Sequence, residues 1–300
     1  MILVIGSDEE AHARFMFEKL KRLNKDIEYF DSRLYPYNIL INYTSDLSSG
    51  FLKINDKKIH LKDIQGVYWR WFYGINYEKT EDEYASDMIY RERESALNSL
   101  FLSLKCNWLN SYEAIKLHKT KIYQLNILQK NGIRVPKTLI TNDEDELIDF
   151  YKKNNKSVIY KPVLGGALTQ KLTDDDLTKE KLSELKQSPI QLQEYIKGID
   201  IRTFAFKNKN VYSAEIYAKT LDFRGDDNHE IINTTLPDSV NNDCLKVLNL
   251  LKLTYSGIDI RKTPEGEYVF IEANPAPMFI HVENVTKYPI SDNIIELLCQ

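Results

Sequence analysis

Two neighbouring segments decide the fold: Tyr255-Ser256-Gly257-Ile258-Asp259-Ile260-Arg261 and Tyr268-Val269-Phe270-Ile271-Glu272-Ala273-Asn274-Pro275. They predict two strands, because each arm is apolar or alternates apolar with polar residues. The connection over 263–267, Thr-Pro-Glu-Gly-Glu, has the composition of a turn. The sequence therefore predicts an antiparallel hairpin that is symmetric about Glu265 and Gly266.

Three polar side chains converge in this hairpin. In the symmetric pairing Asp259 lies directly opposite Glu272, with Cβ atoms roughly 5 Å apart, and Asn274 shares the face of Glu272. Opposed carboxylates repel, and burial increases that penalty. Mg²⁺ prefers oxygen ligands and would remove the conflict. These three residues are therefore candidate metal ligands, and the alternative is two solvated carboxylates on an exposed hairpin.

Length and composition bound the class of protein. The 300 residues are 43% hydrophobic and 28% charged, which is typical of a soluble globular chain with two or three domains. A net charge of −4 and a pI near 5.8 give no basic surface for nucleic acid. No apolar run has membrane-spanning length. The three cysteines, at positions 106, 244 and 299, are widely spaced, which favours reduced thiols and a cytoplasmic protein.

The N-terminal third predicts a parallel sheet. Strands over 1–5 and 27–30 flank a helix, and this βαβ order favours parallel pairing. A long amphipathic helix is expected over 81–104, with Tyr84 and Met88 on its apolar side together with three leucines.

Arg70 lies between Trp69 and Trp71 at the end of an aromatic strand. Two interpretations stay open. The guanidinium is either a satisfied cation stacked on the rings, or an anion ligand at a cleft.

The middle third contains a candidate phosphate site. Asn110-Ser111 predicts the N-cap of one helix that runs to about Asn131. A strand over 158–162 ends with Lys161-Pro162 and is followed by Gly165-Gly166. Lysine at a strand end before glycines suits phosphate, because backbone amides approach closely and the ammonium is a point charge.

Further candidates follow toward the C-terminus. The strand over 190–196 leads into an expected open turn over 197–202, where Asp200 can accept from ribose hydroxyls. Lys219 and Arg224 lie in a polar segment and are suited to neutralise phosphoryl oxygens. The alternative for this segment is an ordinary charged loop.

These residues form a recognisable series: Lys121, Lys161, Gln193-Glu194-Tyr195-Ile196, Asp200-Ile201-Arg202, Lys219 with Arg224, Asp259, and Glu272-Ala273-Asn274. The series resembles that of ATP-grasp ligases, in the branch of the ribosomal-protein glutamate ligases. The stretches 67–70, 108–111, 121–125 and 132–142 resemble more closely the maturases of microviridin-type (graspetide) peptides. The resemblance covers nearly the whole chain. The loop after Lys161 contains fewer glycines than the corresponding loop of many relatives.

The resemblance implies a mixed α/β (α+β) ATP-grasp fold in three domains. These are a pre-ATP-grasp domain over 1–110, a central lid over 111–197, and an antiparallel-sheet domain with the metal site over 198–300. By resemblance, Lys121 and Lys161 hold the α- and β-phosphates, the backbone of Gln193, Glu194, Tyr195 and Ile196 lines adenine, Asp200 binds ribose, and Asp259, Glu272 and Asn274 hold two Mg²⁺ ions.

The implied chemistry is ATP-dependent ligation. The γ-phosphoryl group of ATP passes to a carboxylate, and a hydroxyl or amine then displaces phosphate from the acyl phosphate. Arg202, Lys219 and Arg224 are the candidates that stabilise the acyl-phosphate charge. In graspetide maturases both reacting groups belong to one precursor peptide, and the product is a macrocyclic ester or amide.

Two other functions remain open. One is a ligase that adds free amino acids to a protein tail or a small acid. The other is a non-catalytic nucleotide-binding module. The expected partner is a ribosomally made precursor peptide with a leader and an acidic core, and a homodimer is implied by the resemblance; neither nucleic acid nor a membrane is expected.

Overall fold

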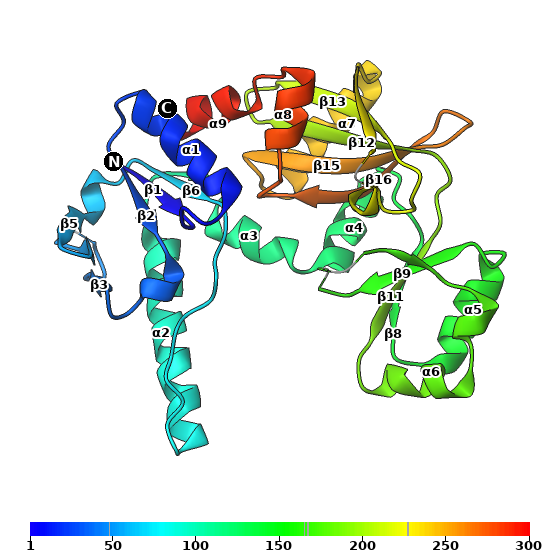
Figure 1. Ribbon diagram of the computed structural model, residues 1–300, viewed down its shortest axis with the longest axis horizontal. Helices are drawn as coiled ribbons and strands as arrows, with labels where there is room; N and C mark the ends of the chain where they lie inside the picture. Colours follow the sequence, from blue (N-terminus) through cyan, green and yellow to red (C-terminus); the bar gives the residue numbers. More distant parts are fainter. Residues whose placement is uncertain (48, 165, 167, 227) are drawn as a thin grey trace.

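The computed structural model describes residues 1–47, 49–164, 166, 168–226 and 228–300, without the side chain of Arg224. It is a mixed α/β structure in which four sheets are surrounded by helices (Figure 1). None of the helices in this described part is long and apolar enough to cross a membrane.

The first third of the chain contains a parallel sheet and a small antiparallel one. Its strands and helices are β1 (Ile2–Ile5), α1 (Ala11–Arg22), β2 (Ile27–Phe30), β3 (Ile39–Asn42), β4 (Phe51–Ile54), β5 (Lys57–His60), β6 (Gly66–Trp69), α2 (Glu83–Ser103) and β7 (Asn107–Leu109). The order β2-β1-β6-β7 is parallel throughout, which confirms the predicted βαβ opening. Strands β3, β4 and β5 form the antiparallel sheet.

The apolar face of helix α2 differs from the expected one. Leu97 and Leu100 are buried as expected, but Tyr84 is 73% exposed and Met88 is 39% exposed. Figure 1 gives the reason, because the first half of α2 extends away from the body of the molecule. The loop over 76–82 lies beside this half of the helix, where Thr80 N–H donates to Ser86 Oγ and the Tyr77 ring contacts Tyr90, but it leaves Tyr84 and Met88 exposed.

The middle third forms a separate antiparallel sheet. Its elements are α3 (Tyr112–His118), α4 (Lys121–Lys130), β8 (Thr138–Thr141), α5 (Glu144–Lys153), β9 (Val158–Pro162), β10 (Gln170–Lys171), α6 (Lys179–Ser183) and β11 (Ile190–Glu194), with sheet order β10-β9-β11-β8. Ser111 caps α3 through Ala114 N–H, as predicted. The expected single helix to Asn131 is wrong, because the chain breaks at Lys119 and Thr120, and Lys121 therefore begins a new helix.

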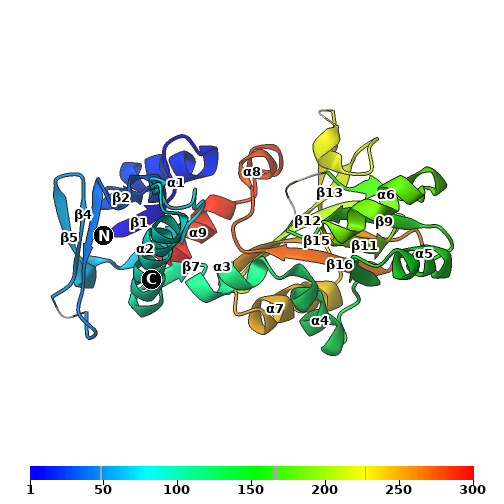
Figure 2. The ribbon, with the colours of Figure 1, turned by 90° about the horizontal axis from the view of Figure 1, so that it is seen from below.

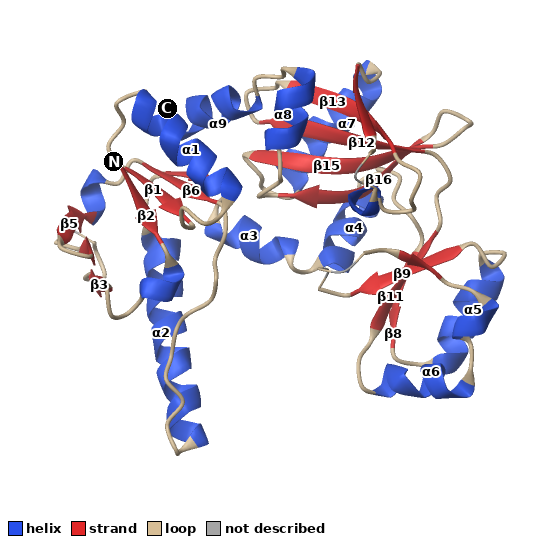
Figure 3. Ribbon diagram, in the orientation of Figure 1, coloured by secondary structure: helices blue, strands red, loops and turns tan. Residues whose placement is uncertain are grey.

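The last third contains the five-stranded antiparallel sheet. Its elements are β12 (Ile199–Phe206), β13 (Val211–Tyr217), β14 (Glu230–Thr234), α7 (Asp238–Leu250), β15 (Tyr255–Lys262), β16 (Tyr268–Asn274), α8 (Ile280–Thr286) and α9 (Ile290–Leu298), with order β14-β13-β12-β15-β16 (Figure 3). The open turn expected over 197–202 is wrong, since Asp200 and Arg202 belong to β12 and pair with residues of β13 and β15. Helix α7 covers one sheet face through Val240, Cys244 and Val247.

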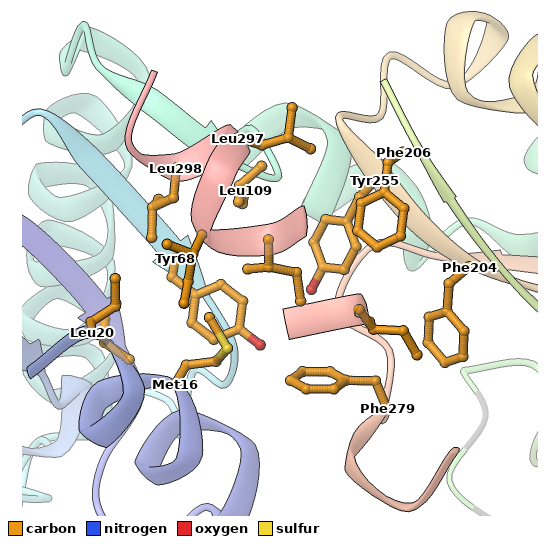
Figure 4. Close-up of a cluster of buried hydrophobic side chains, with 14 of the residues drawn as sticks. Met16, Leu20, Tyr68, Leu109, Phe204, Phe206, Tyr255, Phe279, Leu297 and Leu298 are labelled. Carbon is orange, nitrogen blue, oxygen red and sulfur yellow. The ribbon is translucent and has the colours of Figure 1, made fainter. Parts of the chain in front are cut away.

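One hydrophobic core joins the first and last thirds. Met16 and Tyr68 pack in the same cluster as Phe204, Tyr255 and Phe279 (Figure 4). Helices α8 and α9 lie between the N-terminal sheet and the five-stranded sheet (Figure 2). We propose that 1–110, 111–197 and 198–300 are the three domains, with α9 returning to pack on the first.

Candidate functional site

The hairpin β15–β16 brings the two predicted carboxylates together. Asp259 pairs with Glu272, as the sequence predicts, but Ile260 pairs with Phe270. Ile271 is therefore the extra residue of a β-bulge, which re-aims the side chains on either side of it. Phe270 enters the core beneath α7, while Glu272 faces the same side as Asp259. The symmetric hairpin is thus correct at the site and off by one residue nearer the turn.

A basic side chain neutralises each carboxylate. Arg202 Nε lies 3.0 Å from Asp259 Oδ1, and Lys121 Nζ donates to Glu272 Oε2 at 2.8 Å. Burial and then the charge of Glu272 raise the pKa of Asp259 more than Arg202 lowers it. Burial also raises the pKa of Glu272, but Lys121 and His118 outweigh it, so its net shift is downward. Glu272 is therefore the firmly ionised member of the pair.

His118 is a site residue that the sequence analysis missed. Its Nε2 lies 3.5 Å from Glu272 Oε1, at the C-terminal end of α3. Burial lowers the pKa of His118 and the nearby Lys121 lowers it further, against the opposing effect of Glu272. A lone histidine in a helix carries no sequence signal, and only the break before α4 brings it to the hairpin.

Asn274 lies at the end of β16, paired with Gly257. Its Oδ1 accepts from Ala276 N–H at 2.9 Å. An amide oxygen has two acceptor positions, so this oxygen retains one for a further ligand.

These donors fit Mg²⁺. Two opposed carboxylates and an amide oxygen are hard oxygen ligands, and each carboxylate already attracts a cation. Within the described residues, no group of three or more His, Cys, Asp or Glu side chains is arranged to hold a metal ion by itself. A Mg²⁺ ion here would therefore need water and phosphate oxygens as additional ligands, which is its usual preference.

Lys161 and Gln193 face this site from the central sheet. Lys161 Nζ lies 3.3 Å from Gln193 Oε1, which accepts its hydrogen bond. The charge of Lys161 lowers the pKa of both Asp259 and Glu272, so the two sheets bring the lysine near the carboxylates. The glycine pair expected to follow falls partly outside the described residues, because Gly165 and Ala167 are not described.

The segment over 193–196, predicted to line adenine, consists of the end of β11 and the two residues that follow it. Glu194 Oε1 accepts from Lys137 N–H at 2.9 Å, and Tyr195 N–H donates to Ser157 O at 2.9 Å. Ile196 is 9% exposed. These contacts hold the segment to the residues that directly precede β8 and β9.

Asp200 lies on the same sheet face as Arg202 and Asp259. Its Oδ1 is 3.2 Å from Arg261 Nε, whose guanidinium lies 5.7 Å from the ring centroid of Tyr195. Burial raises the pKa of Asp200 from 3.8 to about 6, against the opposing charge of Arg261. Asp200 thus connects the face of the carboxylates to the predicted adenine segment.

Asp200→Asn is expected to gain stability relative to the unchanged protein as pH rises. The folded state retains the Asp200 proton up to about pH 6 and the unfolded state only to about 3.8, so ionisation destabilises the fold across this window. The effect of Asp200→Asn on the free energy of unfolding should differ between pH 4 and pH 8 by at most about 3 kcal/mol. Urea unfolding at both pH values measures it, with the exposed Asp145→Asn as control. If Asp200→Asn changes the free energy of unfolding equally at both pH values, the raised pKa of Asp200 is contradicted.

Of the two remaining candidate cations, only Lys219 has a described side chain, and it forms no ion pair with Asp259 or Glu272. Lys219 is exposed, and its backbone N–H donates to Asp226 Oδ2 at 2.8 Å. Its side chain forms no ion pair with any described residue. Arg224 belongs to a short 3₁₀ turn, and its side chain lies outside the described part. The loop that carries both contacts the lid, since Thr169 N–H donates to Asp222 Oδ2 at 3.2 Å.

Arg70 is a buried structural cation. Its Nε lies 3.1 Å from Glu10 Oε2, and its Nη1 donates to the carbonyl of Ala276. It is satisfied by a carboxylate and a carbonyl, not by stacking on the neighbouring tryptophans. It therefore holds the loop that follows Asn274 against the N-terminal domain.

Comparison with known proteins agrees with this architecture. Residues 1–116 match the MvdD pre-ATP grasp domain, and residues 118–298 match the RimK-like ATP-grasp domain. The alpha-aminoadipate–LysW ligase LysX of Sulfurisphaera tokodaii is 24% identical over 217 residues, which cover 66% of this chain and 73% of that protein.

Two solved structures match almost the whole chain. The ATP-grasp ligase PsnB complexed with minimal precursor has a TM-score of 0.86 at 26% identity, covering 99% of this chain and 97% of PsnB. The RiPP-associated ATP-grasp ligase of Chryseobacterium gregarium, in complex with ADP and a leader and core peptide, has a TM-score of 0.84 at 26% identity, covering 99% and 96%. PsnB is also known with Mg and ADP.

The fold and these matches define an ATP-grasp ligase, a class that uses ATP and Mg²⁺. The RimK-like match spans more than half of the chain. The chain therefore belongs to the RimK-like ATP-grasp family, with an MvdD-type pre-ATP-grasp domain before the catalytic part.

Proposed function

We propose that this ligase activates Asp or Glu side chains of a ribosomally made precursor peptide and closes macrocyclic esters or amides. The observation that carries this proposal is the match of nearly the whole chain, including the N-terminal domain, to peptide-bound RiPP ligases. The curated relative LysX matches 66% of the chain, so it supports the ligase chemistry more than the substrate.

Each site residue has a proposed role in binding. Asp259, Glu272 and Asn274 would hold Mg²⁺, with room for two ions when phosphate oxygens complete the ligand sets. Bound metal would offset the negative charge that develops on the phosphates. Lys121 and Lys161 would contact the α- and β-phosphates. The segment 193–196 would line adenine, and Asp200 would accept from ribose. When nucleotide and metal bind together, Lys121 would leave the carboxylate of Glu272 and contact phosphate instead.

The reaction follows in two balanced steps. A substrate carboxylate oxygen forms a bond to the γ-phosphorus as the β–γ bridging bond breaks, giving an acyl phosphate and ADP. A substrate hydroxyl or amine then attacks the acyl carbon, loses its proton, and releases phosphate. Arg202, Lys219 and Arg224 are proposed to stabilise the phosphoryl oxygens. Arg202 has the strongest structural support, because it already lies beside Asp259.

Mass spectrometry of a small acidic peptide encoded beside this gene, incubated with the protein, ATP and Mg²⁺, tests the proposal. We expect the loss of one water mass for each bond formed. Mild base then separates esters, which hydrolyse, from amides, which do not. A peptide that stays unchanged while the protein consumes ATP on a different substrate would contradict the proposal.

A ligase that adds free amino acids is the second candidate, favoured by the similarity to LysX. Its product gains the mass of an amino acid residue, so the same spectrum distinguishes it. A non-catalytic nucleotide-binding module would release no ADP with any substrate. The opposed carboxylates disfavour that module, since adenine binding alone does not require them.

The proposed partner is a precursor with a leader and an acidic core, as in the peptide complexes of the similar ligases. We also propose a homodimer, which light scattering would test. Cytoplasmic location is proposed from the three free cysteines at 106, 244 and 299.

A further inference from the structure

Strand β16 lies at the edge of the five-stranded sheet. The outer side of an edge strand exposes N–H and C=O groups that the sheet does not pair. Ala273, between Glu272 and Asn274, has such groups, and the side chain of Gln124 satisfies both of them. Gln124 Nε2 donates to Ala273 O at 2.9 Å, and Gln124 Oε1 accepts from Ala273 N–H at 2.9 Å. One amide therefore acts as a one-residue neighbouring strand.

This contact is buried and belongs to a single helical turn. Gln124 is 3% exposed, and it lies three residues after Lys121 on α4, so both side chains share one helix face. Lys121 binds the carboxylate of Glu272, while Gln124 binds the backbone of the next residue. This turn of α4 therefore holds both the carboxylate of Glu272 and the backbone of Ala273.

The chain beyond the site is held separately. Asn110 Nδ2 donates to Pro275 O at 2.7 Å and to Tyr255 O at 2.8 Å, and Arg70 donates to Ala276 O. These contacts fasten the loop that follows Asn274. Gln124 instead holds the strand itself, at the residue between Glu272 and Asn274.

We propose that Gln124 is a positioning residue for the metal ligands Glu272 and Asn274. The proposal rests on the proposed metal site and assigns to it a supporting residue that does not touch metal or substrate. Tilting the backbone at Ala273 would move both ligands at once, because they flank it on the same strand. Partners that orient metal ligands are typically worth roughly 10- to 100-fold in metal affinity.

Gln124→Met tests this role, because methionine keeps the length and helix propensity of glutamine but removes both hydrogen bonds. Mn²⁺ binding is titrated by electron paramagnetic resonance in the presence of a non-hydrolysable ATP analogue, so no peptide substrate is required. We expect Mn²⁺ affinity to fall about 10- to 100-fold. Affinity for the analogue without metal should change less than about 3-fold, because no predicted nucleotide contact is altered.

Gln129→Met is the matched control, since it makes the same substitution at an exposed position of α4. It should bind Mn²⁺ like the unchanged protein. If Gln124→Met does not fold, Gln124→Asn keeps the amide, but its side chain is one methylene shorter and does not span the distance to Ala273, so it is expected to show the same loss. Unchanged Mn²⁺ affinity in the folded Gln124 variant would overturn the positioning role alone. Failure of the unchanged protein to bind Mn²⁺ would instead overturn the metal site on which the proposal depends.

Discussion

Glu272→Gln is expected to abolish ADP release while nucleotide binding persists. Glutamine has the same shape but lacks the negative charge that Glu272 retains beside Lys121, and a neutral amide is a weaker ligand for Mg²⁺. The loss of turnover should reach about 10²- to 10³-fold or more, as for other groups that stabilise transition-state charge. Nucleotide affinity without metal should stay within a few-fold, since Lys121 and Lys161 remain. Coupled ADP detection and equilibrium nucleotide binding measure the two quantities.

Glu267→Gln is the control for this change. It lies at the turn of the same hairpin, is 55% exposed at its side chain, and forms an ion pair with Arg134 at 3.3 Å. Its ADP release should match that of the unchanged protein. ADP release that persists in Glu272→Gln would refute the assignment of Glu272 as a metal ligand.

Arg202→Met is expected to reduce ADP release by about 10²- to 10³-fold, the typical effect of losing one group that stabilises developing negative charge. Arg202 lies at 3.0 Å from Asp259 on the face shared with Glu272, so its charge is close to the proposed phosphates. Its removal also deprives Asp259 of the basic group that lowers its pKa most, so the pKa of Asp259 should rise further. Arg202→Lys should recover part of the rate, because a point charge replaces the guanidinium fork.

Arg134→Met makes the same substitution at a 52% exposed side chain of an ion pair on the hairpin turn. It should leave ADP release unchanged. Steady-state ADP release at saturating ATP and Mg²⁺ separates a catalytic loss from weaker binding. If Arg202→Met turns over like Arg134→Met, then Lys219 and the loop around it become the stronger candidates.

The sequence could predict the features that depend on local patterning. Apolar alternation and a five-residue turn were enough to predict the hairpin, and strand periodicity put Asp259 opposite Glu272. The same reasoning predicted the parallel βαβ opening and the cap at Ser111. In each case the signal lies within a few residues of the feature, so no knowledge of distant contacts was needed.

Two of the local predictions that failed concern helices. The helix that was expected to run to Asn131 breaks after Lys119, in a segment without proline or glycine, so composition gave no warning. The first half of α2 has an amphipathic pattern, but Tyr84 and Met88 on its expected apolar side stay exposed. Periodicity indicates which side of a helix is apolar, but burial also requires an opposing surface.

The sequence by itself determined which residue types meet at the hairpin, because strand period and turn position act over short distances. Only the tertiary structure decided how those residues are held. The bulge at Ile271 separates Phe270 from Glu272, and α4 delivers Lys121 and Gln124 from about 150 positions earlier in the chain. Contacts of such separation depend on how helices and sheets pack, and no spacing in the sequence specifies that packing.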